Sequence, residues 1–581
     1  MTDDLPPVLD PCLAKDDAFD LTDQPWLPVL LLDGTETALS LGEVFARARE
    51  IRRLAGDLPS QDFALLRLLL AILHDALDGP GDIEDWAELW EADDPFALVP
   101  AYLDAHRDRF DLLHPTRPFF QVAGLRTAKD EVLGLNRIVA DVPNGHPFFT
   151  NRFPGVEQIS FAEAARWVVH AHAFDTSGIK TGVEGDPRAT NGKAYPQGVG
   201  WAGTLGGVAA EGDDLRETLL LNLVAFDSGA AGGAGTDVPA WRRPAYGPGA
   251  AADLASRPAG VRDLYTWQSR RMRLHHDGSA VRGVVLTYGD PLAQQDRMKL
   301  EPMTGWRRSQ AQEKKLRRPL VYMPREHDPS RSVWRGLESL IVPLDHDASK
   351  PGEVPSSYRP GVVDWLAKLA TERVLAKGTL IRVRTCGVVY GTQQSVVDEV
   401  FEDAVAMPVM LLCADDRRLA QEAVDAVADA ERAVTALGDL AADLARAAGG
   451  EPESRRSMAR HRGFAALDGP YRNWLAALRA GDDPQERRAE WRCVARGEIE
   501  RIAAELLGGA GEAAWAGRLV DGPKGREWLN NSSAQLRFRS RIKRLLPPAG
   551  APDTADSGPS DAADGPQTNT VPGPETMKVP V

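Results

Sequence analysis

The sequence contains little cysteine. Its 581 residues include four, Cys12, Cys386, Cys413 and Cys493, and none of them belongs to a C-x-x-C pair. This excludes a disulfide scaffold and argues against a structural zinc site made of four thiolates. Such sparse use of cysteine is typical of a reducing compartment, so we expect a cytoplasmic protein.

Long apolar runs are also missing. The most apolar stretch, residues 63–73, is interrupted by Arg67 and is far shorter than the ~20 residues that a membrane span requires. Residues 1–10 are acidic and rich in proline, which is not the pattern of a signal peptide. We therefore expect no membrane partner, and a buried helix over 61–77 with Ser60 as its N-cap.

The chain has no excess of positive charge. With 68 Lys and Arg against 84 Asp and Glu, its net charge is −16. Such a chain would repel phosphate as a whole, which excludes a simple basic nucleic-acid binder and leaves only local patches for such contacts. Segment 262–335 departs from this balance, because it holds 16 Arg and Lys against 8 Asp and Glu.

Aromatic residues interleave with the cations of this basic segment. Paired cations can bind phosphate, and aromatic rings can stack on bases. A solvated face that balances the acidic remainder would have the same composition, and the residues alone leave both interpretations open. The residues concerned are Tyr265, Trp267, Arg270, Arg271, Arg273, Trp306, Arg307, Arg308, Lys314, Lys315, Arg317 and Arg318.

Short catalytic signatures are not found: the chain has no G-x-S-x-G elbow, no Walker A loop and no H-E-x-x-H. Residues 198–203 match G-x-G-x-x-G, but no strand before them and no helix after them is predicted, so a dinucleotide site is not expected. His170 and His172 would point in different directions on a helix and make a poor metal site with Asp175. We expect no metal or cofactor and favour a binding protein; an enzyme that uses His170 and Asp175 is an alternative.

The patterns predict an α+β protein, with a large mixed α/β N-terminal domain followed by a C-terminal four-helix bundle and a disordered tail. Apolar residues recur on one helix face at 424, 427, 434, 437 and 444. The last 35 residues hold eight Pro, four Gly and no aromatic residue, too little apolar surface to offset ordering. The predicted parts are a disordered lead (1–18), the mixed domain (19–403), the bundle (404–546) and the tail (547–581), with further bundle helices at 455–479, 485–508 and 523–546.

Within the mixed domain, apolar periodicity predicts helices over 161–174 and 215–224 and strands over 283–288, 319–323 and 380–390. The long polar stretch 175–207 is expected to be a functional or disordered loop. A turn at 391–395 follows the last strand. Its glutamine amides can donate and accept hydrogen bonds, so they could contact base edges; a plain polar turn is the simpler interpretation.

Taken together and in this order, several segments resemble the CasA family, the large subunit of the type I-E CRISPR surveillance complex, Cascade. They are FDLTDQPWLPV at 19–29, LRETLLLNLV at 215–224, LYTWQSRRMRL at 264–274, the GTQQS turn at 391–395 and the helical C-terminal region. The resemblance implies a protein without catalysis. Such a protein is expected to recognise the protospacer-adjacent motif (PAM) in double-stranded DNA, to begin strand opening and to help recruit the helicase-nuclease. Its partners are the other Cascade subunits, the target DNA and the crRNA, whose 5′ handle it contacts.

The family's functional parts can be carried over by position. The glutamine wedge, a hairpin tip inserted beside the PAM, matches Gln393, flanked by Thr392 and Gln394. The minor-groove lysine matches Lys314, with Lys315 as a close rival. The resemblance thereby implies that the mixed domain, 19–403, recognises the PAM.

The resemblance implies two further parts, and the chain departs from some family members in one respect. The glycine loop falls on Asn191, Gly192, Lys193, Ala194 and Tyr195, and is less rich in glycine than the family pattern. The guide-handle loop matches residues 146–151, in which Phe148, Phe149 and Asn151 would hold the crRNA. Some family members carry paired cysteines for zinc, which this chain lacks.

The last predicted helix is rich in cations that suit a DNA backbone or a partner subunit: Arg537, Arg539, Arg541, Lys543 and Arg544. Cations that favour the helix C-terminus are the simpler interpretation. For the whole chain, a scaffold that docks acidic protein partners through its basic segment is the alternative function.

Overall fold

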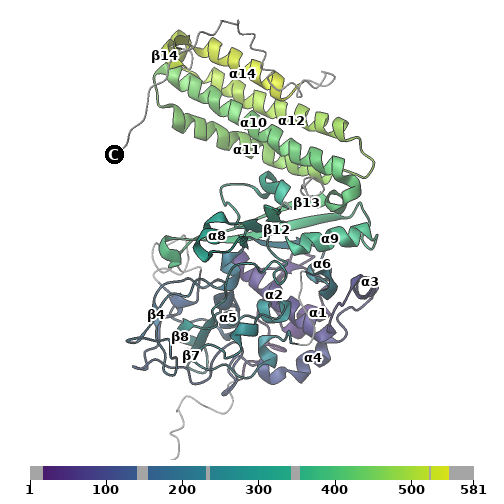
Figure 1. Ribbon diagram of the computed structural model, residues 1–581, viewed down its shortest axis with the longest axis vertical. Coiled ribbons are helices and arrows are strands. Elements are labelled where there is room, and N and C mark those ends of the chain that lie inside the picture. The colour runs from purple at the N-terminus through teal and green to yellow at the C-terminus, as the bar shows by residue number, and fades with distance from the viewer. Residues whose placement is uncertain (1–17, 141–154, 230–235, 342–353, 523–524, 548–581) are drawn as a thin grey trace, which may run out of the picture. The chain divides into compact units, whose positions relative to one another are not determined.

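The strands form three sheets of three strands and three two-stranded ladders, all antiparallel, within the described part of the chain. Figure 1 draws the strands as arrows and the helices as coiled ribbons. The computed structural model describes residues 18–140, 155–229, 236–341, 354–522 and 525–547. Two compact units divide the chain. Unit 1 comprises Met1–Glu431 and Phe464–Trp491, and unit 2 comprises Arg432–Gly463 and Arg492–Val581.

The core of unit 1 is built around helix α2 (Pro59–Leu77), which is buried along nearly its whole length. It packs against α5 (Phe161–Phe174), whose bounds agree with the prediction. The charge of Arg67 is tolerated there because its guanidinium makes two 2.8 Å hydrogen bonds to Glu301. The prediction for Ser60 is wrong: the helix begins at Pro59, two residues before the predicted start, so Ser60 lies inside it and Leu58 is the N-cap.

The sheet that matters most for the site contains β6 (Gly207–Glu211), β12 (Leu380–Tyr390) and β13 (Val397–Pro408) in the order β13-β12-β6. Strand β12 matches the predicted strand. It pairs with β13 along its whole length but with β6 only from Arg382 to Cys386. From Gly387 onward, the hairpin is therefore a two-stranded arm. Residues 404–408, expected to begin the helical region, are strand instead.

The remaining strands lie mainly in unit 1. They are β1 (Leu27–Leu31), β2 (Glu36–Leu39), β3 (Ile51–Leu54), β4 (Lys180–Thr181), β5 (Lys193–Ala194), β7 (Arg270–His276), β8 (Val281–Tyr288), β9 (Trp306–Arg308), β10 (Tyr322–Pro324) and β11 (Ser357–Tyr358), with β14 (Arg518–Gly522) and β15 (Gly525–Leu529) in unit 2. The strand predicted at 283–288 lies within β8, whereas the strand predicted at 319–323 overlaps β10 only at residues 322–323.

Shorter helices cover these sheets. They are α1 (Leu41–Ala46), α3 (Ile83–Glu91), α4 (Val99–Ala105), α6 (Leu215–Asn222), α7 (Val261–Tyr265), α8 (Gln310–Leu316), α9 (Gly361–Thr371) and, in unit 2, α13 (Glu512–Ala516). Helix α6 corresponds to the helix predicted at 215–224. No helix in the described ranges is both long and apolar enough to cross a membrane.

The C-terminal region is helical, as expected. Its long helices are α10 (Arg417–Ala448), α11 (Pro452–Ala476), α12 (Pro484–Gly508) and α14 (Asn531–Leu545). The first three pass from one unit to the other. In unit 1 their segments share an aromatic cluster in which Trp334 stacks on Tyr471 with ring centroids 4.5 Å apart, and Trp491 meets Tyr471 edge-on.

In unit 2 the segments of the four long helices contact one another. Gly463 of α11 lies against Val434 and Leu437 of α10, and Asn531 at the start of α14 donates a 3.2 Å hydrogen bond to the carbonyl of Leu507 in α12. The helix predicted at 523–546 is only partly correct. Residues 525–529 form β15, and the helix begins after Asn530, whose side chain caps it.

Candidate nucleic-acid interface

The turn at the end of the β12–β13 arm presents two glutamines to solvent. Gln393 and Gln394 are exposed, and both adopt φ of 56°, in the left-handed region that few non-glycine residues occupy. The turn is closed by two hydrogen bonds, from the N–H of Gly391 to the carbonyl of Val396 at 3.0 Å and from the N–H of Gln394 to that of Gly391 at 2.9 Å. This tip therefore has a defined shape rather than being a loose loop.

The tip is docked on the loop that follows α5. The N–H of Ser177 donates a 2.7 Å hydrogen bond to the carbonyl of Gln394. A β-carbon on Gly178 would lie 3.4 Å from the β-carbon of Ser395, so Gly178 lies close beside Ser395. At the base of the tip, the hydroxyl of Tyr390 donates a 2.7 Å hydrogen bond to the carbonyl of Phe174. The end of α5 and residues 175–178 thus support one side of the tip.

The same loop leads directly to the predicted glycine loop. Lys180 and Thr181 form β4, which pairs with Lys193 and Ala194 of β5, and the N–H of Gly182 donates to the carbonyl of Gly192 at 2.9 Å. Asn191 and Gly192 turn the chain with φ of 53° and 72°. The structure therefore brings two predicted parts, the glutamine tip and the 191–195 loop, to the two ends of one short segment.

Most of the predicted glycine loop is accessible. Asn191, Gly192, Lys193 and Tyr195 are exposed, whereas Ala194 is buried. The side chain of Ala194 is therefore packed inside and is not available to a ligand. A role for its backbone in the loop stays a prediction. The polar stretch 175–207, expected to be functional or disordered, is ordered by β4, β5 and a turn of 3-10 helix at Trp201–Thr204.

The predicted lysines lie on a different element, the short helix α8. Its N-cap is Ser309, and Lys314 and Lys315 occupy its last turn. Both are exposed, and within the described ranges neither forms an ion pair. Their neighbour Arg308 is neutralised by Glu313 at 2.6 Å. The two lysines are therefore available as cations, although no contact of theirs in the described residues reaches the tip.

The basic segment as a whole is not a binding face. Arg270 and Arg271 are buried and pair with Asp175 and Asp290. The aromatic residues Tyr265, Trp267 and Trp306 are buried as well and cannot stack on bases. Arg270, Arg271 and the three aromatic rings therefore cannot form a nucleic-acid face, because folding places them in the core. The exposed cations of the segment are Arg307, Lys314, Lys315, Arg317 and Arg318, among others.

The histidines considered for a metal or enzyme site have structural roles. His170 Nε2 lies 2.9 Å from the hydroxyl of Ser60, and His172 Nε2 lies 2.9 Å from the carbonyl oxygen of Phe120. Burial lowers the pKa of both to about 3, so both are neutral near pH 7. No group of three or more metal-ligating side chains is found in the described residues.

The glycines of the 198–203 motif serve packing. A β-carbon on Gly200 would lie 2.4 Å from the backbone of Ala173, and one on Gly203 would lie 2.2 Å from the hydroxyl oxygen of Tyr390. Glycine is required at both positions because another chain segment occupies the space of a side chain. The glycines are thus explained by close packing, and residues 201–204 form a turn of 3-10 helix where a dinucleotide motif would open an α-helix.

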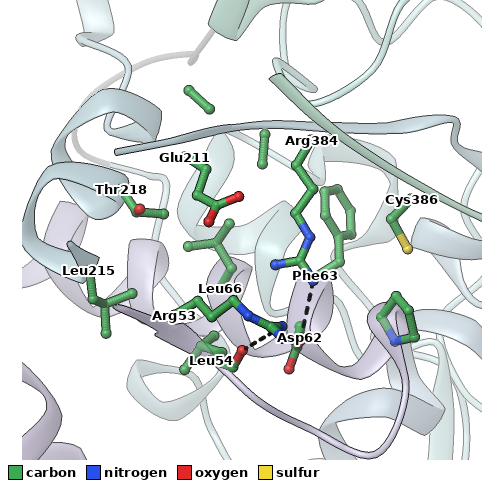
Figure 2. Close-up of a pocket in the computed structure, with 13 residues that line it drawn as sticks. Arg53, Leu54, Asp62, Phe63, Leu66, Glu211, Leu215, Thr218, Arg384 and Cys386 are labelled. Atoms are coloured by element: carbon green, nitrogen blue, oxygen red, sulfur yellow. Dashed lines mark hydrogen bonds and ion pairs between the residues drawn. The ribbon is translucent and has the colours of Figure 1, made fainter. Parts of the chain in front are cut away.

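A small pocket lies at the root of the arm, between α2, β3, β6 and β12 (Figure 2). Its floor is apolar, with Phe63 and Leu66, and Arg384 points toward Asp62 across its rim at 3.5 Å. Burial raises the pKa of Asp62 in spite of this pairing. The cavity volume is about 40 Å³, which holds water rather than a substrate. The exposed arm is a better candidate for function than this pocket.

The cationic helix α14 is partly neutralised. Arg537 pairs with Glu527 at 2.6 Å and Arg541 with Asp439. Arg539, Lys543 and Arg544 are exposed and form no ion pair within the described ranges. Three of the five predicted cations thus remain available to a partner.

The predicted guide-handle residues Phe148, Phe149 and Asn151 lie outside the described residues. Sequence reasoning also missed Ser177, Gly178 and Tyr390, which hold the tip. None of these residues belongs to a recognisable motif. The only signal in the sequence was the end of the predicted strand at Tyr390.

Comparison with known proteins agrees with this architecture. The family model described as CRISPR-associated protein Cse1 matches residues 20–502. The crystal structure of Thermobifida fusca Cse1 is 56% identical, and the match covers 91% of this chain and 98% of that chain with a TM-score of 0.84. Cse1 from Acidimicrobium ferrooxidans is 31% identical over 92% and 98% of the two chains, with a TM-score of 0.76.

A curated relative, the CRISPR-associated protein CasA/Cse1 of Thermus thermophilus, is 29% identical over 352 residues. That match covers 58% of this chain and 64% of the relative, so it spans somewhat less than two thirds of the Thermus protein. The structural matches extend over nearly the whole of the solved chains.

Proposed function

The chain belongs to the CRISPR-associated Cse1 (CasA) family, which confirms the resemblance found in its sequence, and from this we propose that it is the non-catalytic large subunit of a type I-E Cascade complex. In this role it recognises the PAM in double-stranded DNA and begins to separate the strands. The guide RNA then reads the rest of the target by base pairing, so the protein needs to read only a short duplex motif.

The observation that carries this proposal is the exposed glutamine tip on the two-stranded arm. Inserting a side chain between base pairs costs a few kcal/mol of unstacking per step. A tip whose turn is closed by its own hydrogen bonds has little conformational freedom left to lose on insertion. The amide of Gln393 can also donate to and accept from the base edges that it frees, which offsets part of the lost pairing. Thr392 and Gln394 flank it on the same turn.

The neighbouring 191–195 loop and the α8 lysines supply the motif contacts in this proposal. Gly192 has no side chain, so the backbone of its turn can approach a groove closely. The minor groove is too narrow for a helix but admits a single long cationic chain, as Lys314 or Lys315 would provide. Because the whole chain is acidic, these local cations must act against a net charge of −16.

The remaining assignments follow the family. The mixed domain, whose last strand β13 ends at Pro408, recognises the PAM, and the helical region from α10 onward forms the bundle. The 146–151 loop contacts the 5′ handle of the crRNA, and the chain binds other Cascade subunits and helps to recruit the helicase-nuclease. The free cations of α14, Arg539, Lys543 and Arg544, contact the DNA backbone or a partner subunit.

Gln393→Ala in the assembled complex tests the wedge. We expect duplex target capture to fall about tenfold or more, equivalent to ~1.4 kcal/mol or more. Target that is already unpaired beside the PAM should bind within about twofold of the wild-type level, since its opening needs no wedge. The measurement is equilibrium binding to both targets, and Gln158→Ala, at another exposed glutamine, is the control. An equal loss on both targets would refute the wedge.

A scaffold that docks acidic protein partners is the alternative function. The DNA-recognition role and the scaffold role differ in whether binding requires DNA. Binding of duplex that weakens steeply with salt supports the DNA-recognition role, because phosphate contacts release counterions. Binding to assembled protein alone, with no response to DNA, supports the scaffold.

A further inference from the structure

A buried ionic cluster lies directly beneath the loop that supports the glutamine tip. The carboxylate of Asp175, at the end of α5, pairs with Lys180 of β4 at 2.7 Å and with the Nε of Arg270 of β7. All three side chains are shielded from solvent, with exposures of 7%, 10% and 2%. Burial alone would raise the pKa of Asp175, but the two cations outweigh it and hold the pKa below its ordinary value.

Arg270 also ties the backbone of this loop together. Its Nη2 donates to the carbonyls of Asp175 at 2.9 Å, Thr176 at 3.1 Å and Gly198 at 3.0 Å. One guanidinium therefore crosslinks the two ends of the 175–198 segment. A planar fork with several donors can do this, whereas a lysine ammonium is a point charge on a flexible stem.

Tyr288 of β8 completes the support from the same side. Arg270 lies over its ring at 4.9 Å and Lys180 at 5.4 Å, both within the range of cation–π attraction. Its hydroxyl donates a 2.5 Å hydrogen bond to the carbonyl of Gly178. Arg270 of β7 and Tyr288 of β8 thus hold residues 175–178, and Ser177 of the same loop binds Gln394 of the tip.

We propose that Asp175 and Arg270 are positioning residues that join the Gln393 tip and the Asn191–Gly192 turn into one preformed unit. This inference rests on the proposed function. According to this proposal, reading of the PAM and opening of the strands are coupled mechanically. The Gln393 tip and the Asn191–Gly192 turn both contact the segment that Asp175 and Arg270 hold in place. Neither Asp175 nor Arg270 touches DNA; they act through Ser177 at one end and β4 at the other.

Few contacts in the described residues join the tip to its support. They are an N–H···O bond from Ser177, the packing of Gly178 against Ser395 and the hydroxyl of Tyr390; residues 395–397 also line a small pocket with residues 136–140. These contacts restrain the tip only as far as the 175–178 loop is itself immobile. Loops without such anchors have high mobility and low local stability. The buried cluster removes that mobility at the point where the tip is attached.

Distance measurements between two spin labels test the coupling without DNA. The labels are placed on Thr392→Cys and Lys193→Cys, both exposed positions, in a chain with Cys12→Ser and Cys493→Ser; Cys386 and Cys413 are buried. We expect one narrow distance distribution in the otherwise native chain. Arg270→Lys should give a broad distribution, because lysine keeps the positive charge but loses the planar guanidinium that donates to several carbonyls at once. Asp429→Asn, which breaks a buried pair with Arg488, is the matched control and should leave the distribution narrow.

The assembled complex gives the functional test. Arg270→Lys should lower capture of duplex target about tenfold and leave capture of pre-opened target within about twofold. Asp429→Asn should affect both targets equally or not at all. Thermal unfolding of each variant is measured in parallel, since a role in stability alone would follow the melting temperature and not the ratio of the two targets. If Arg270→Lys does not fold, Tyr288→Phe, which removes only the hydroxyl bond to Gly178, replaces it.

The outcomes separate the two proposals. A narrow distance distribution in the Arg270→Lys chain overturns the coupling, whatever Gln393→Ala does. A broad distribution together with an unchanged duplex preference in Gln393→Ala supports the coupling and contradicts the wedge. A broad distribution together with a selective loss of duplex capture in both variants supports both proposals.

Discussion

The hydroxyl oxygen of Tyr390 lies 2.2 Å from the place that a β-carbon on Gly203 would take. The same hydroxyl donates a 2.7 Å hydrogen bond to the carbonyl of Phe174, at the base of the glutamine tip. Gly203, in the glycine-rich motif, and Tyr390, at the end of β12, therefore pack directly against each other. This contact sets how the arm rests on α5.

Gly203→Ala should therefore displace Tyr390 and weaken the support of the tip. Overpacking of this kind costs ~1–3 kcal/mol of the free energy of unfolding. We expect a lower melting temperature and a selective loss of duplex capture. Gly134→Ala is the control, because a β-carbon there meets no atom within 4 Å. Wild-type stability in Gly203→Ala would show that Tyr390 can move aside freely.

Lys314→Ala and Lys315→Ala should reduce binding that depends on the PAM. Each lysine is exposed and without an ion pair in the described residues, so its charge is available to DNA. Loss of one phosphate contact should lower the slope of log K against log salt by about 0.9. A lysine that reads the groove would also reduce discrimination between PAM and non-PAM duplexes.

Titrations of binding at several salt concentrations, with PAM and scrambled duplexes, distinguish these two effects. Lys129→Ala, at an exposed lysine on another segment, is the comparison. Unchanged discrimination in both α8 variants would contradict the assignment of a minor-groove lysine to this helix.

The free energy of unfolding should fall as the pH drops below about 6.5. Burial lowers the pKa of His74, His170 and His172 to about 3 in the folded chain. Below the unfolded pKa of about 6.5, the unfolded chain binds protons that the folded chain refuses, so acid favours unfolding. Each histidine lowers the free energy of unfolding by up to ~1.4 kcal/mol for each unit that the pH falls between about 6.5 and 3.

Urea unfolding at pH 7 and pH 5 measures this dependence. His74→Asn removes one titrating group and keeps a side-chain N–H that can donate to the carbonyl of Gly79, which His74 Nδ1 approaches to 3.0 Å. We expect a smaller loss of stability between the two pH values in this variant than in the native chain. An identical loss would mean that His74 is not a buried neutral group.

Local patterns were sufficient for many elements. The helix over 161–174 and the strand over 380–390 were predicted with the bounds that the structure has, because apolar periodicity and short-range turn chemistry determine them. The turn at 391–395 was found for the same reason. Where local signals conflict, the prediction was wrong: residues 525–529 form a strand, although they were assigned to the helix predicted at 523–546.

Contacts between distant segments were beyond the sequence. Ser177 carries no motif, and its bond to Gln394 depends on how α5 and the β12–β13 arm are packed. Arg270 and Arg271 looked like surface cations because arginine is usually exposed, and their partners Asp175 and Asp290 are far away in the chain.

The identity and order of segments along the chain were enough to identify the family and to place a glutamine at a turn tip, since these depend on residue identity and spacing. Only the tertiary structure decided which cations face solvent and which neutralise buried carboxylates. It also decided that the tip and the 191–195 loop share one support. The physical reason is that burial and ion pairing arise from the packing of segments distant in sequence, which no local pattern encodes.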